Sequence, residues 1–247
     1  MALFTDGTIS IIEDLVGYES GILETAVTER IDLTIKLSLA QDELGIDLDA
    51  YLTRQGSTLG LGNVVVTPPL SKCHTFRALV LAYRDAYSKE LNDRYLAKLT
   101  EYQELADWAW DALVETGPGT VTDPIPRAAS PQLSSIAAAA AAAATYFVRV
   151  SWVASDGEEG SPSDIATLIV AEGNTLVVTA ANPPAQASGW NVYAGLSAEE
   201  QTLQNDGALP LGGQWTAPVT GLQQGTPAGT GQAPESYLLP GPNVMWR

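Results

Sequence analysis

The side chains that most often perform chemistry are few and poorly spaced in this sequence. Its single cysteine, Cys73, and its single histidine, His74, are adjacent. Neighbouring side chains on a helix point about 100° apart, so this pair cannot act as a nucleophile and its base. A cysteine/histidine zinc site within one chain needs more of these ligands than the sequence holds. We expect a buried Cys73 and a partly exposed His74.

Two other segments have the composition of a ligand site without its spacing. The glycine-rich stretch 56–62 lacks the lysine and the following helix of a phosphate-binding loop. The acids Asp156, Glu158 and Glu159 match no known calcium loop and are typical of a solvated hairpin tip. The sequence therefore predicts no catalytic residues, no metal site and no cofactor, which argues against an enzyme.

The net charge limits the partners. Twelve Lys and Arg against 29 Asp and Glu give −17, a field that repels phosphate backbones. Residues 1–130 hold ten bases and twenty acids, whereas residues 131–247 hold two bases and nine acids, which indicates two regions of different design. This negative charge is explained either by solubility alone or by a channel for DNA whose wall must not bind the DNA that passes through it. No apolar stretch is long enough to predict a membrane span.

Apolar residues at three- and four-residue spacing predict a helical bundle in the first half of the chain. The pattern favours helices over 8–16, 19–44, 47–55, 70–90 and 92–115, with Gly17 and Gly45 as breaks and Arg30 interrupting one apolar stripe. Short or glycine-rich connections favour antiparallel neighbours. We assign residues 1–116 to this domain.

The three- and four-residue spacing of apolar residues stops beyond Gly117. Residues 117–144 read as a linker, rich first in proline and then in alanine. The run 137–144 fits a short helical spacer and equally the entry to a strand, because alternating apolar residues begin at Thr145. Short β-rich segments then predict a β-sandwich over 145–220, with the fibronectin type favoured over the immunoglobulin type because no cysteine pair is present. The fold class expected is thus α+β and multidomain.

The last segment, 221–247, is rich in glycine and proline and predicts an extended C-terminal arm. Its apolar end predicts a docking element that is disordered until it meets a partner, with the contact residues Tyr237, Leu238, Leu239, Val244, Met245, Trp246 and Arg247. A chance tryptophan on a disordered end is the alternative.

Four segments of the helical region carry a resemblance: 31–45 (IDLTIKLSLAQDELG), 66–70 (VTPPL), 83–87 (YRDAY) and 91–95 (LNDRY). Together they resemble head-to-tail adaptor proteins of tailed bacteriophages. Residues 189–195 (GWNVYAG) resemble the fibronectin or immunoglobulin-like modules appended to phage virion proteins.

The resemblance implies a structural protein of the virion neck, assembled in the host cytoplasm. It implies a ring of twelve subunits that sits beneath the portal protein, contacts tail or neck proteins and lets DNA pass without sequence-specific binding. Within such a ring we expect subunit salt bridges from the interleaved charges Arg77, Arg84, Arg94, Asp85 and Asp93.

A second hypothesis is a decoration or adhesin protein of the virion whose β-domain binds a host-surface glycan. Glycan pull-down would separate the two hypotheses.

Overall fold

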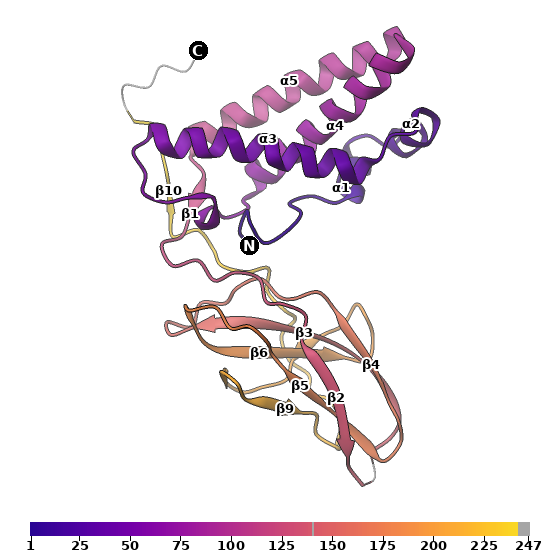
Figure 1. The fold of residues 1–247 in the computed structure, drawn as a ribbon, viewed down its shortest axis with the longest axis vertical. Helices are drawn as coiled ribbons and strands as arrows, with labels where there is room; N and C mark the ends of the chain where they lie inside the picture. The colour runs from indigo at the N-terminus through magenta and orange to yellow at the C-terminus, as the bar shows by residue number, and fades with distance from the viewer. Residues whose placement is uncertain (140, 242–247) are drawn as a thin grey trace. The chain divides into compact units, whose positions relative to one another are not determined.

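A computed structural model describes residues 1–139 and 141–241. It contains both helices and antiparallel sheets, which confirms the mixed composition expected from the sequence (Figure 1). The chain forms two compact units, each built from separate segments. The helical unit consists of residues 7–122 and the segment from 234 onward, and the β unit consists of residues 1–6 and 123–233.

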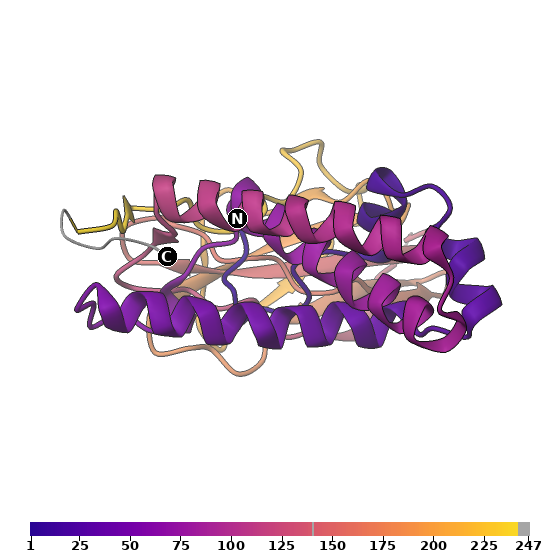
Figure 2. The same ribbon diagram turned by 90° about the horizontal axis from the view of Figure 1, so that it is seen from above.

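The helical unit is organised around one central helix. Its helices are α1 (Ile12–Tyr18), α2 (Ile22–Glu29), α3 (Leu33–Arg54), the short 3-10 helix η1 (Leu61–Asn63), α4 (Pro68–Glu90) and α5 (Asp93–Thr116). α4 packs against α1, α2, α3 and α5. α3 and α5 therefore flank α4, and Figure 2 shows them on opposite sides of the bundle.

The helix predicted over 19–44 is wrong in its bounds. α2 ends at Arg30, which takes a left-handed conformation (φ 53°), and the side chain of Asp32 then accepts hydrogen bonds from the backbone N–H groups of Thr34 and Ile35. These bonds satisfy donors at the start of α3. The expected break at Gly45 does not occur, because this buried glycine lies inside α3. A glycine in a helix interior costs about 1 kcal/mol relative to alanine, which tertiary packing can offset.

The β unit contains two antiparallel sheets. One has the order β4 (Ala166–Val170), β3 (Ala144–Ala154), β6 (Ala187–Gly195) and β7 (Thr202–Leu203), and β8 (Leu209–Pro210) also pairs with β6. The other has the order β2 (Gln132–Ala137), β5 (Asn174–Thr179) and β9 (Gln214–Thr216). The alternating pattern that begins at Thr145 predicted β3, and β-rich segments predicted β4, β5 and β6.

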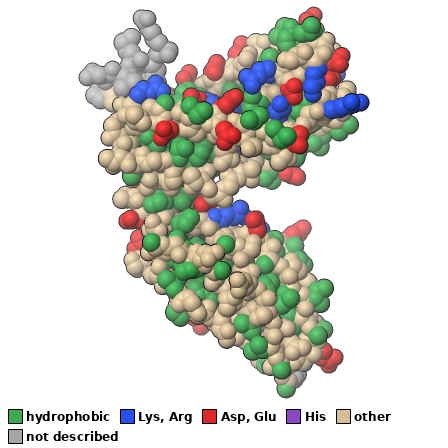
Figure 3. Space-filling model, in the orientation of Figure 1, with side chains coloured by type: hydrophobic (Ala, Val, Ile, Leu, Met, Phe, Trp, Pro, Cys, Tyr) green, Lys and Arg blue, Asp and Glu red, His purple; other side chains and the backbone are tan. Residues whose placement is uncertain are grey.

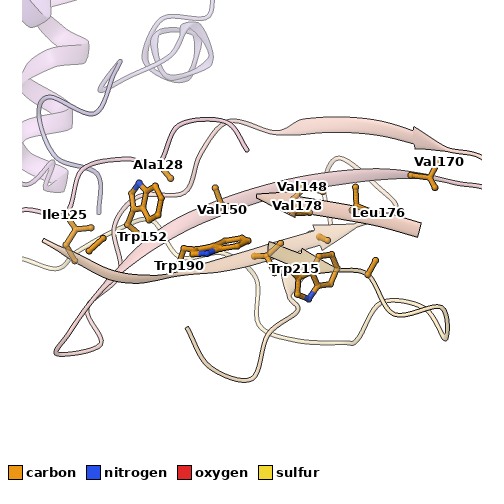
Figure 4. Close-up of a cluster of buried hydrophobic side chains, with 14 residues drawn as sticks. Ile125, Ala128, Val148, Val150, Trp152, Val170, Leu176, Val178, Trp190 and Trp215 are labelled. Carbon is orange, nitrogen blue, oxygen red and sulfur yellow. The ribbon is translucent and has the colours of Figure 1, made fainter. Parts of the chain in front are cut away.

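Both sheets contribute to one apolar core. Val150 and Trp152 of β3, Trp190 of β6, Val178 of β5 and Trp215 of β9 belong to a single cluster (Figure 4). The indole N–H of Trp190, itself 1 % exposed, donates to the carbonyl oxygen of Pro210 at 3.1 Å. The most deeply buried of the three core tryptophans thus has its polar atom satisfied.

The proposed linker 117–144 contains two strands, β2 and the short β1 (Gly119–Thr120). β2 ends at Ala137 and β3 begins at Ala144, so the alanine run connects the two sheets and is not a helical spacer as far as it is described. Ala138 donates its N–H to Gly173, and Ala141 accepts from the N–H of Gly173. The turn before β5 thereby satisfies backbone groups that an isolated alanine helix would satisfy internally.

No helix within 1–139 and 141–241 is long and apolar enough to cross a bilayer.

Candidate interaction surfaces

The C-terminal segment lies on the helical unit as far as Gly241, the last residue described. β10 (Ser236–Tyr237) pairs with β1 in antiparallel register, Gly119 opposite Tyr237. The N–H of Leu238 donates to the carbonyl oxygen of Pro118 at 3.1 Å, and the N–H of Gly241 donates to Oε1 of Gln55 at 2.9 Å. The expectation of an arm disordered in the free chain is therefore wrong for residues 236–241, whose backbone groups find partners in the same chain.

Two glycines permit this docking. A Cβ on Gly117 would lie 2.5 Å from the carbonyl oxygen of Leu238, and Gly117 also has a φ of 77° that favours glycine. A Cβ on Gly119 would lie 2.8 Å from the Pro234 ring. The sequence reveals the Gly117-Pro118-Gly119 turn, but only the structure shows that it makes room for β10.

The first half of the predicted arm, residues 221–233, belongs to the β unit instead. The N–H of Leu203 donates to the carbonyl oxygen of Thr226 at 2.9 Å, and Nε2 of Gln204 donates to the carbonyl oxygen of Gln223 at 2.8 Å. Side-chain amides of this kind can replace regular strand pairing, which explains how a segment rich in glycine and proline holds a fixed path.

The predicted docking residues differ in exposure. Tyr237 and Leu239 are 53 % and 61 % exposed, whereas Leu238 between them is half-buried. This alternation is the one expected of an extended segment with one face against its own unit. Val244, Met245, Trp246 and Arg247 lie outside the described residues.

The predicted subunit-interface charges are engaged within the chain in three of five cases. Arg77 pairs with Asp47, and Arg84 lies 3.9 Å from a carboxylate oxygen of Glu43. Asp85 accepts from Lys36 at 3.0 Å, with Lys89 at 3.7 Å. Burial by itself would raise the pKa of Asp85, but the hydrogen bond and charge of Lys36 and the charge of Lys89 outweigh it and lower the pKa.

The other two, Asp93 and Arg94, are exposed in the first turn of α5. No ion pair joins either of them to another residue in the described parts of the chain.

The candidates for chemistry serve packing instead. Cys73 and His74 are both fully buried, so the expected partial exposure of His74 is wrong; α4 is covered by helices on several sides. Burial raises the pKa of the Cys73 thiol to about 12 and lowers that of His74, whose Nε2 lies 2.9 Å from the carbonyl oxygen of Leu37. Such a thiol is a poor nucleophile at neutral pH.

Glu159 is likewise not part of a solvated tip. Its carboxylate accepts hydrogen bonds from the hydroxyls of Ser151 and Tyr193, the latter at 2.6 Å. Burial and this carboxylate both raise the pKa of Tyr193. These bonds hold the turn after β3 against the sheet, and no cluster of acids, histidines or cysteines suited to a metal occurs among the described residues.

Apolar side chains exposed on the helices form a further candidate surface. Ile35, Leu39 and Ile46 lie on the outer face of α3 and are 43 to 71 % exposed. Ile35 and Leu39 belong to a second apolar stripe of the helix predicted over 19–44, together with Leu23, Val27 and Ile31. That stripe predicted neighbours on both sides of the helix. Among the described residues of the helical unit, nothing buries the side chains of Ile35, Leu39 and Ile46.

A shallow apolar pocket of about 140 Å³ opens between the start of α4 and the end of α5. It is lined by Pro68, Pro69, Lys72, Trp108, Ala109 and Ala112. Trp108 is 54 % exposed, and the Lys72 ammonium lies 5.8 Å from its ring centroid. An exposed tryptophan beside a pocket is the type of residue that dominates protein interfaces.

No protein-family model, curated protein or solved structure matches this chain.

Proposed function

We propose that this chain is a structural, non-catalytic subunit of a tailed-phage neck: a head-to-tail adaptor that forms a ring beneath the portal protein. The C-terminal segment is the observation that carries the proposal. Its backbone is fixed to the helical unit by β1, Tyr51 and Gln55, while Tyr237 and Leu239 face outward. A partner would therefore meet a preformed edge.

Preformed geometry changes the energetics of docking. Ordering a free segment costs on the order of 1 kcal/mol per residue of backbone, which subtracts from the affinity. Residues 236–241 are already held by the helical unit, so that cost does not fall on the binding step. The contribution of Tyr237 and Leu239 to partner binding is correspondingly larger.

Unpartnered apolar side chains on α3 and α5 support the ring. Exposed apolar residues that gather on a helix face are typical of protein interfaces. A ring needs two different contact surfaces on each subunit, and exposed apolar side chains occur on more than one part of the helical unit.

The β unit, in this proposal, is a fibronectin- or immunoglobulin-like module carried outside the ring. Two antiparallel sheets around one apolar core support this assignment. The net charge of −17 supports a channel wall that DNA passes without adhering.

Electron microscopy and light scattering of the purified chain, alone and with the portal protein of the same phage, test the proposal. We expect rings that cap the portal. Rings should bind portal at least tenfold more weakly when Tyr237→Ala and Leu239→Ala are combined, a change that spares the backbone contacts of β10. A folded chain that neither forms rings nor binds portal would overturn the proposal.

A further inference from the structure

One end of the helical unit carries apolar side chains that face solvent. We call it the apolar end and define it by Leu23, Val27, Arg30, Leu91, Arg94 and Leu96. Val27 is 80 % exposed and Leu91 is 72 % exposed. Figure 3 shows hydrophobic side chains where α4 and α5 are joined, with Lys and Arg side chains close by.

Hydrogen bonds hold the three helices of this end together. The Lys89 ammonium donates to the carbonyl oxygen of Glu29 at 2.7 Å, which joins the ends of α4 and α2. The Tyr95 hydroxyl donates to the Glu29 carboxylate at 2.7 Å, which joins the start of α5 to them. The apolar residues are thus presented on a fixed frame.

Two of its residues take a backbone conformation that favours glycine. Leu91 ends α4 with a φ of 51°, and Arg30 ends α2 with a φ of 53°. Glycine is the usual residue at such helix ends, because other residues pay a steric penalty there. An exposed leucine gains little packing within its own chain in return. The side chain of Leu91 is therefore best explained by a contact with another molecule.

The opposite end of the α4–α5 pair offers a complementary surface. The pocket beside Trp108 is apolar, and its volume of about 140 Å³ is large enough for an aliphatic side chain. Beside it runs an acidic row on α5, which consists of Glu104, Asp107, Asp111 and Glu115.

The acidic row is unfavourable within a single chain. Its members are three or four residues apart and all exposed, a spacing at which like charges repel on a helix. Asp111 and Glu115 also lie near the C-terminal end of α5, where negative charge opposes the helix dipole. Among the described residues none of the four is in an ion pair with a base. A basic partner would relieve this repulsion.

We propose that the apolar end of one copy of this chain docks on the Trp108 pocket of a second copy. Leu91 fills the pocket, and Arg30 and Arg94 face the acidic row. Neither arginine has an ion-pair partner among the described residues. The exposed acids Glu24, Glu90 and Asp93 lie at the same end, so the attraction is local to the two arginines and the end as a whole is not basic. The inference rests on the ring of the proposed function and specifies its interface.

The two surfaces differ, so the contact is heterologous. Repetition of such a contact produces a closed ring when the rotation between neighbours closes, whereas an isologous contact stops at a dimer. This difference gives a direct test by cross-linking. Cys73 does not interfere, because it is buried.

The test uses Leu91→Cys and Ala112→Cys chains under mild oxidation. We expect a disulfide-linked dimer when the two single variants are mixed, no dimer from either variant alone, and a ladder of linked species from the chain that carries both. A dimer from Leu91→Cys alone would overturn the inference. Rings that form without this cross-link would overturn it too, while leaving the proposed function intact. Absence of any assembly would overturn both the inference and the ring.

A second experiment separates binding from folding. Leu91→Gly should leave the thermal stability of the chain unchanged or raised, because glycine suits the backbone there, yet raise the concentration needed for assembly about tenfold or more. Ile169→Ala, an equally exposed residue of β4, serves as the matched control and should leave assembly unchanged. Unchanged assembly of Leu91→Gly would overturn the inference.

Charge reversal gives an independent readout. Arg94→Glu and Asp111→Arg should each weaken assembly, and the chain that carries both should recover it, since each interface then regains an opposite pair. Failure of the double variant to recover, with both single variants folded, would count against the pairing.

Discussion

The hydroxyl of Tyr51 donates a hydrogen bond of 2.7 Å to the carbonyl oxygen of Leu238, 187 residues further along the chain. Tyr51 is buried at the end of α3, and Leu238 follows directly after β10. This bond ties the C-terminal segment to the helical unit beyond the two-residue pairing of β1 and β10. A substitution at Tyr51 can therefore weaken the attachment of the C-terminal segment without any change in the segment itself.

Tyr51→Phe should loosen the C-terminal segment. The change removes the hydrogen bond and keeps the ring in place, and a hydrogen bond of this type contributes about 0.5 to 1.5 kcal/mol. Hydrogen exchange of the backbone N–H groups of residues 236–241 should become about two- to tenfold faster. Tyr237→Phe, at an exposed tyrosine, is the control. Equal exchange in Tyr51→Phe and the unaltered chain would show that β10 pairing alone holds the segment.

Gly117→Ala should displace the same segment more strongly. The new Cβ would lie 2.5 Å from the carbonyl oxygen of Leu238, a contact too short to persist. Gly56→Ala is the control for positive φ alone, because Gly56 has a φ of 67° and open space where a Cβ would go. We expect proteolysis between 233 and 241 to accelerate in Gly117→Ala and not in Gly56→Ala. Equal protection in both variants would contradict the role assigned to Gly117.

Stability should depend on pH through His74. Burial lowers the pKa of His74 below its ordinary value of 6.5, so the unfolded chain binds a proton more readily than the folded chain. The free energy of unfolding should therefore fall as pH drops below about 6.5, by up to about 1.4 kcal/mol per pH unit until the folded pKa is reached. Denaturant titration of the chain at several pH values measures this dependence of the free energy of unfolding on pH.

His74→Gln provides the control for that pH dependence, since glutamine does not titrate and still carries an N–H donor for Leu37. The slope between pH 6.5 and 5 should flatten in this variant. Carboxylates with lowered pKa values, such as Asp85, lose their contribution only at lower pH. A slope unchanged by His74→Gln would assign the dependence to other groups.

Trp190 should dominate the stability of the β unit. It is the largest of the fully buried side chains, and its N–H has a partner in Pro210. Trp190→Ala should lower the free energy of unfolding of the β unit by about 3 to 5 kcal/mol, as cavity formation in a core does. Ile169→Ala, at a residue 79 % exposed, should change it by less than about 0.5 kcal/mol. Comparable losses in the two variants would contradict the core assignment.

The elements that could be predicted from the sequence are those with strong local patterns. α4 and α5 follow from apolar spacing, β3 follows from alternation, and β4 to β6 follow from β-rich runs between turn signals. Gly45 misled the prediction because tertiary packing of α3 overrides a local penalty of about 1 kcal/mol. The exposure of His74 could not be read from the sequence, because it depends on how many helices cover α4.

The interaction surfaces were harder to predict, for a physical reason. β10 is two residues long, and its partner β1 lies more than a hundred residues earlier, so no local pattern indicates the pairing. Arg77, Arg84 and Asp85 were predicted to form salt bridges between subunits, but they form ion pairs within the chain. Leu91 continues the apolar spacing of α5 in the sequence, and only its backbone angle and exposure show that it lies outside the core.

The division of each unit between separate segments has a consequence for cleavage. The chain passes from one unit to the other at three places, 6/7, 122/123 and 233/234. One peptide bond cut at any of them leaves two covalent connections intact. Release of the β unit by a protease should therefore require three cuts, and a singly nicked chain should migrate as one species until it is denatured.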